Sequence, residues 1–165
     1  MSARGTYTAP AGTDIGHVHL KVADLERAIA FYHGVLGFDI TTRYGTQAAF
    51  LSAGGYHHHI GLNTWKSRGG TPAPPGHTGL YHHAIRYPTR ADLAAAVRHV
   101  VDAGVPLRGS SDHGVSEAIY LDDPDGNGVE LYWDRPMELW PHGPNGELVM
   151  HTLPLDLDAL LQLAP

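Results

Sequence analysis

The chain has 165 residues, 42% of them hydrophobic, which is enough for one domain with a real core. Its net charge of −6 argues against nucleic acid as a partner. No apolar run is long enough to span a membrane, and residues 1–12 lack the apolar stretch of a signal peptide. With no cysteine for disulfides or thiolate metal sites, these features predict a cytoplasmic protein.

The first predicted unit begins with a strand over residues 15–22. A helix over residues 25–36 follows, with Asp24 as its N-cap and Gly37 as its stop, because the apolar residues between them follow the helical period. Three short strands are then expected at residues 39–44, 47–52 and 56–63. A stretch rich in glycine and proline, residues 69–79, is typical of a linker.

A second unit repeats this order. Its predicted elements are a strand at 81–87, a helix at 90–103 stopped by Gly104, and strands near 107, at 115–122 and at 128–133, the last two joined by a turn at 123–128. The same spacing separates His17 from His82 and Asp24 from Thr89, a second N-cap. The pattern predicts an α+β fold, in which two βαβββ units form one curved mixed sheet with the helices outside.

The predicted domain covers residues 14–136, with units at 14–65 and 80–134. Residues 137–165 form a C-terminal extension outside the repeat, with a short helix expected at 155–163. We expect this extension to pack on the domain or on a partner subunit, and its alternative is a loosely ordered tail.

His17, His82 and Glu130 occupy related places in the predicted strands. Side chains alternate along a strand, so each of the three points away from neighbours that are mainly apolar. Two imidazoles and one carboxylate form the facial triad that holds Fe(II) and leaves positions open for substrate and dioxygen. Each residue alone would be interpreted as structural, but their repeat-related placement favours a metal site. The same ligands also accept Mn(II), Ni(II) or Zn(II).

Three stretches, HVHLKVADLERAIAFYHGVLGF, GLYHHAI and YLDDPDGNGVELYWDRP, resemble the vicinal-oxygen-chelate superfamily of glyoxalases, bleomycin-resistance proteins and extradiol dioxygenases. The segments HHHIGLNTW and RPMELWPHGPNGELVMHTLPLDL are most similar to the first module of two-module catechol 2,3-dioxygenases, and the chain ends where a second module would begin. The resemblance implies a metal cavity with ligands at the three positions named above. It further implies that Tyr120 contacts a catecholate, that His113 lines the cavity, and that His59, or less favourably His57, acts as acid–base.

The resemblance therefore implies an extradiol, meta-cleaving dioxygenase that uses Fe(II) and dioxygen to open a catechol-type ring, and that forms a homodimer. A glyoxalase-type isomerase or lyase with nickel or zinc is an alternative, although that class has Glu or Gln on the fourth strand, where this chain has histidines and Asn63. The other alternative is a non-enzymatic binding protein of the bleomycin-resistance kind, which has no need of an intact triad.

Overall fold

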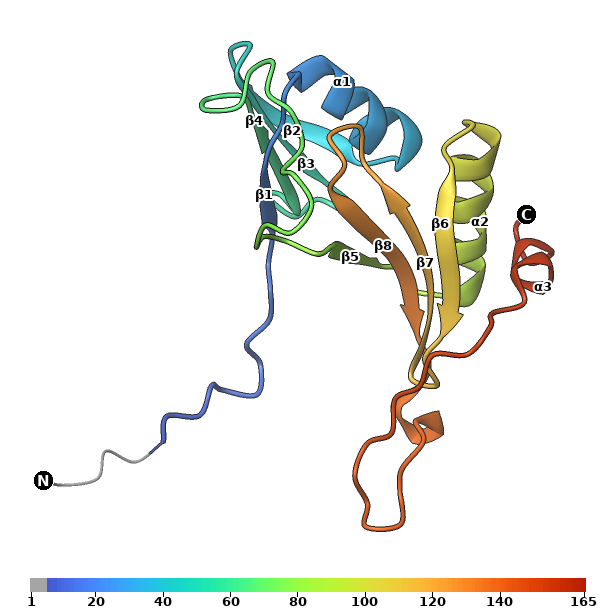
Figure 1. Ribbon diagram of the computed structural model, residues 1–165. Coiled ribbons are helices and arrows are strands. Elements are labelled where there is room, and N and C mark those ends of the chain that lie inside the picture. Colours follow the sequence, from blue (N-terminus) through green and yellow to red (C-terminus); the bar gives the residue numbers. More distant parts are fainter. Residues whose placement is uncertain (1–5) are drawn as a thin grey trace, which may run out of the picture.

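The computed structural model describes residues 6–165, so the first five residues of the segment expected to lack a signal peptide lie outside the described residues. Each half of the chain is a βαβββ unit, as the repeat predicts (Figure 1). Unit 1 consists of β1 (Val18–Lys21), α1 (Leu25–Ile29), η1 (Ala30–Val35), β2 (Asp39–Tyr44), β3 (Ala48–Ser52) and β4 (Ile60–Asn63). Unit 2 consists of β5 (His83–Arg86), α2 (Arg90–Asp102), β6 (Leu107–Asp112), β7 (Ser116–Asp122) and β8 (Gly128–Asp134).

Both helices begin at the predicted caps. The Asp24 side chain accepts a hydrogen bond from the backbone N–H of Arg27, and Thr89 forms a reciprocal capping box with Asp92. Gly37 and Gly104 follow the helices with φ of 78° and 74°, a conformation that favours glycine. The helix predicted over residues 25–36 is α-helical only at its start, because η1 continues it with π-helical turns.

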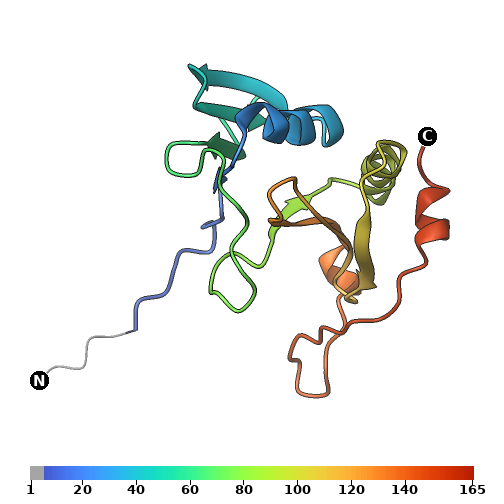
Figure 2. The same cartoon turned by 45° about the horizontal axis from the view of Figure 1, so that its top comes forward.

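The strands form two four-stranded mixed sheets, ordered β1-β4-β3-β2 and β5-β8-β7-β6, rather than the one curved sheet expected from the sequence. In each sheet the first strand of the unit pairs in parallel with the last. Among residues 6–165, β1 and β5 each pair along one edge only, so no strand joins the two sheets. The sheets lie apart in both views (Figures 1 and 2).

The two units nevertheless share one hydrophobic core. Its members come from the helix-facing sides of both sheets and from both helices, and include Leu51, Leu62, Leu93, Val97, Val129 and Leu131, all fully buried. The alternation predicted for the last strand is confirmed, because Val129 and Leu131 are buried on this side while Glu130 is partly exposed on the other. His83 also packs inward, with its ring 5.8 Å from that of Tyr32.

A turn of unit 2 is anchored on the helix of unit 1. The hydroxyl of Tyr32, which is fully buried, donates to Asp123 Oδ2 over 2.9 Å. Asp125 accepts from the backbone N–H of Ala23 and from the guanidinium of Arg27. We call this group of contacts the inter-unit latch. It connects residues about ninety to a hundred positions apart, and so it ties the β7–β8 turn to the opposite half of the chain.

The C-terminal extension packs on its own chain. It contains η2 (Met137–Leu139) and α3 (Leu157–Leu161), which is capped by Asp156. Leu160 is fully buried, and the guanidinium of Arg98 on α2 donates to the carbonyl of Leu161 over 2.9 Å. Figure 1 shows α3 lying beside α2, with a loop of the extension projecting from the domain. Among residues 6–165, no helix is long and apolar enough to cross a membrane.

Replacing Tyr32 by phenylalanine is expected to lower the free energy of unfolding by roughly 1.5–3 kcal/mol, because the buried hydrogen bond to a carboxylate is lost. Urea unfolding measures this change. Tyr87→Phe is the matched control: the Tyr87 hydroxyl is buried with no hydrogen-bond partner among the described residues, so its removal should leave stability unchanged or increase it. Equal losses in the two variants would contradict a stabilising latch.

Candidate functional site

Two of the predicted ligands meet where β5 and β8 begin to pair. Ala84 lies opposite Glu130 in the parallel register, and His82 immediately precedes β5. His82 Nε2 is 2.9 Å from Glu130 Oε2. The carboxylate side chain is only 13% exposed, so its charge requires a partner. This partner is either a proton on His82 Nε2 or a cation bound by both His82 and Glu130.

A glycine at the start of β8 permits this approach. A Cβ atom at Gly128 would lie 2.3 Å from the Tyr81 carbonyl oxygen and 3.0 Å from His82 Cβ. Any side chain at this position would therefore push the two strands apart just where the ligands converge.

Tyr120 and His113 extend this pair into a chain of hydrogen bonds. Tyr120 is the direct antiparallel partner of Glu130, and its hydroxyl lies 3.2 Å from Glu130 Oε1. His113 Nε2 lies 2.8 Å from the same hydroxyl. Burial, followed by the negative charge of Glu130, raises the pKa of Tyr120 to about 12, so the phenol keeps its proton at neutral pH.

These side chains border a pocket of about 390 Å³, a size suited to a small organic ligand. Its lining includes His82, His113 and Tyr120 from the hydrogen-bonded chain, with Arg108 and Thr152 on other sides. Thr152 belongs to the C-terminal extension, so that segment contributes directly to the wall.

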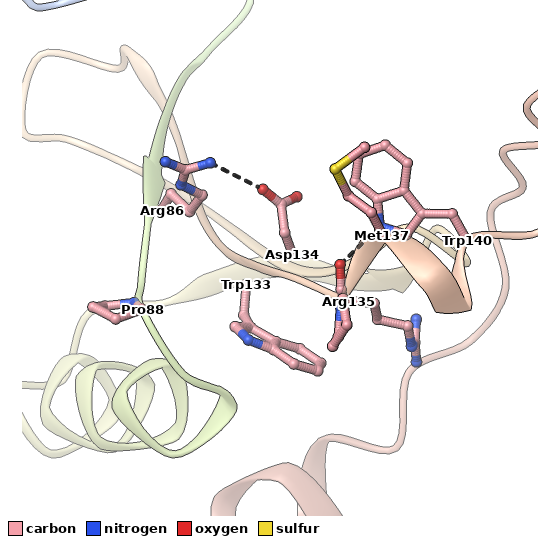
Figure 3. A pocket seen from close by; sticks show the side chains of 8 residues that line it. Arg86, Pro88, Trp133, Asp134, Arg135, Met137 and Trp140 are labelled. Atoms are coloured by element: carbon pink, nitrogen blue, oxygen red, sulfur yellow. Dashed lines mark hydrogen bonds and ion pairs between the residues drawn. The ribbon is translucent and has the colours of Figure 1, made fainter.

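A second pocket, of about 380 Å³, lies where the extension leaves β8 (Figure 3). Its charged groups are engaged with protein partners: Arg86 pairs with Asp134, and Arg135 pairs with Asp112 and Glu117. None of the predicted ligands lines it.

His17 lies among the histidines of unit 1. Its exposed side chain packs against His58, with ring centroids 4.4 Å apart and the rings tilted by 49°, and His58 Nδ1 lies 2.7 Å from His57 Nδ1. The pKa of His58 is lowered, first by partial burial and then by the neighbouring imidazoles of His17 and His57. The pKa of His19 is lowered for the same two reasons, with His17 as its neighbour. A group of imidazoles thus lies at the start of β1.

His59, the predicted acid–base, is placed differently from His58. Its Nδ1 accepts from the backbone N–H of Ala53 over 3.3 Å and lies 3.1 Å from Ser52 Oγ. Its ring packs near Phe38 and Tyr56. The strand expected at 56–63 begins only at Ile60, so the three histidines lie in a bend, where alternation does not determine their directions. The sequence offered the triplet but no signal that selects His58, the one beside His17.

Among residues 6–165, no three His, Asp or Glu side chains come close enough together to hold a metal ion. One chain therefore brings His82 and Glu130 together, but not His17 with them. The pair does fit a divalent transition metal: bonds of about 2.1 Å place two neighbouring ligand atoms roughly 3 Å apart, close to the observed separation. Imidazole with carboxylate is also a donor set that such metals accept.

Curated proteins similar to this chain include dioxygenases. It is 40% identical to a catechol-2,3-dioxygenase of Bacillus subtilis over 92% of the chain and 52% of that protein. It is 33% identical to biphenyl-2,3-diol 1,2-dioxygenase 3 of Rhodococcus globerulus, over 73% of the chain and 63% of that protein. The chain thus spans about half of the first relative and less than two thirds of the second.

Solved structures confirm the α+β fold. A glyoxalase/dioxygenase from Nostoc punctiforme matches 81% of this chain and all of its own, with a TM-score of 0.64 at 19% identity. A lactoylglutathione lyase from Agrobacterium tumefaciens matches 75% of this chain and 96% of its own, with a TM-score of 0.58 at 21% identity. The family model of the Glyoxalase/Bleomycin resistance protein/Dioxygenase superfamily matches residues 14–131, and the chain belongs to this superfamily.

Proposed function

We propose that this chain is an extradiol dioxygenase that opens catechol-type rings with Fe(II) and dioxygen. The observation that carries the proposal is the convergence of His82 and Tyr120, which line one pocket, on the carboxylate of Glu130. Two relatives that are at least 33% identical are named as dioxygenases of aromatic diols. Fe(II), when bound by two imidazoles and a carboxylate, supplies adjacent open positions for the two diol oxygens and dioxygen.

The chain's own groups have separate tasks in this proposal. His82 and Glu130 would hold the metal. Tyr120, which keeps its proton at neutral pH, would contact a substrate oxygen through its hydroxyl group. An imidazole of unit 1 would accept and return the diol proton. The sequence predicts His59 for this role, but the position of His58 against His17 makes His58 the better candidate.

We further propose that the site is completed across a homodimer, with His17 supplied by a second copy. Two observations support this arrangement: the described chain assembles only two of the three ligands, and it spans about half of the catechol-2,3-dioxygenase to which it is similar. In a two-fold dimer, each copy gives His17 to one site and receives it in the other.

Anaerobically purified protein is expected to contain about one iron per chain and to convert catechol in air to a yellow ring-cleavage product. Metal analysis and absorbance at visible wavelengths measure both. His82→Ala should lose iron and activity, whereas His77→Ala, an exposed linker histidine, should keep both. Nickel or zinc without ring cleavage would favour the isomerase or lyase, and no bound metal would favour the binding protein.

The shared site is testable by mixing two inactive variants. His17→Ala and His82→Ala chains, unfolded and refolded together in equal amounts, should recover about a quarter of wild-type activity, because half of the dimers are mixed and each holds one intact site. Each variant refolded alone is the control. No recovery in verified mixed dimers would place all ligands within one chain.

His58→Gln is expected to lower kcat by a factor of about 10² or more, as loss of a general acid–base does. His59→Gln should have a smaller effect, because His59 bonds to the end of β3. Steady-state kinetics with iron content held equal compare the two. A larger loss of kcat in His59→Gln than in His58→Gln would instead favour His59, the acid–base predicted from the sequence.

A further inference from the structure

The C-terminal extension adds a short strand-like segment to the outer edge of β6. The backbone groups of Asp112 and Leu153 exchange two hydrogen bonds of 2.9 Å, and the His151 N–H donates to the His113 carbonyl over 3.3 Å. Since β6 is the last strand of its sheet, these bonds satisfy groups that would otherwise face solvent. We call residues 151–153 the edge segment.

His113 lies between this edge segment and Tyr120. Its Nδ1 is 2.8 Å from the carbonyl oxygen of His151, and its Nε2 is 2.8 Å from the Tyr120 hydroxyl. A carbonyl only accepts, so the contact with His151 requires the proton on Nδ1. A neutral imidazole has one N–H, and Nε2 is then the acceptor for Tyr120.

The direction of the Tyr120 proton bears on the metal ligand. A phenol has one proton to donate, and the contact with His113 is shorter than the 3.2 Å contact with Glu130 Oε1. When the proton is directed to His113 Nε2, the 3.2 Å contact of Tyr120 with Glu130 is no longer a hydrogen bond, and the lone pairs of that carboxylate stay available to a cation. The backbone of the extension thus acts on the ligand through two intervening side chains.

Two features hold the edge segment against His113. Arg135, which lies between β8 and the extension, donates two hydrogen bonds of 2.7 and 3.1 Å to the Asp112 carboxylate. Gly114 has φ of 77°, and a Cβ atom there would lie 2.6 Å from His151 Cε1 and 3.0 Å from Pro141 Cγ. The turn therefore needs glycine both for its backbone conformation and for the close approach of the extension.

We propose that the edge segment is a positioning element of the site: the His151 carbonyl holds His113 as the Nδ1–H tautomer and so makes its Nε2 the acceptor of the Tyr120 hydroxyl. The consequence for catalysis rests on the proposed function. The tautomer does not, and it can be measured on metal-free protein without substrate.

The experiment is ¹⁵N NMR of histidine side chains in the full chain, above the pH range in which imidazoles titrate. Signals that disappear in His113→Gln identify His113. We expect a protonated Nδ1 and an unprotonated Nε2 in the wild type. Gly114→Ala strains the backbone next to His113 and crowds the His151 ring and Pro141, so it should break the Nδ1 contact and move the proton to Nε2. Gly146→Ala is the matched control, because its φ of 82° imposes the same strain with no atom within 4 Å of the added Cβ.

Leu153→Pro provides a second test if Gly114→Ala does not fold, because it removes the N–H that bonds to Asp112. It should cause the same tautomer shift. In the proposed reaction, Gly114→Ala should lower kcat about 10-fold or more relative to Gly146→Ala, as loss of support around a ligand does.

A His113 that carries its proton on Nε2, or on both nitrogens, in the wild type would overturn the inference. So would folded Gly114→Ala or Leu153→Pro protein that keeps the wild-type tautomer. Absence of ring cleavage with the expected tautomer would instead contradict the proposed function and leave the positioning role intact.

Discussion

The site depends on the parallel pairing that closes each βαβββ unit, in which the first strand lies beside the last. Because this pairing joins residues far apart in sequence, it places the residue before β5 next to a side chain near the end of the unit. In unit 2 the result is an imidazole beside a carboxylate. In unit 1 the residues in contact just before the corresponding strands, His17 and His58, are both imidazoles.

The repeated βαβββ fold therefore produces two chemically different groups of side chains, one in each unit. The carboxylate of unit 2 carries charge into a partly buried place and needs a counter-charge, whereas in unit 1 partial burial and then the neighbouring imidazoles lower the pKa of His58. Neutral imidazoles are metal ligands and proton acceptors, and a carboxylate is the anionic partner that a divalent cation requires. The imidazoles of unit 1 and the carboxylate of unit 2 are complementary ligands, which is the chemical reason to propose that they bind one metal ion.

Strand alternation was enough to predict which side chains of β5 and β8 face the core, because both strands alternate regularly where they pair. It failed for His57, His58 and His59, which lie in a bend before β4. The π-helical continuation of α1 could not be predicted from the sequence either, because its residues satisfy the α-helical period equally well. Whether His17 joins His82 depends on how the sheets are arranged, and that arrangement follows from the shared core, which no local pattern describes.

The inter-unit latch has a consequence for how copies of the chain could associate. The linker at 69–79 is exposed along its length, and the contacts of Tyr32, Arg27 and Ala23 with the β7–β8 turn lie entirely between the two units. If two copies exchanged their second units, every one of these contacts would form again between chains. Domain exchange would then cost only the entropy of association and any strain in the linker, so protein concentration and linker length would set the balance between closed and exchanged forms.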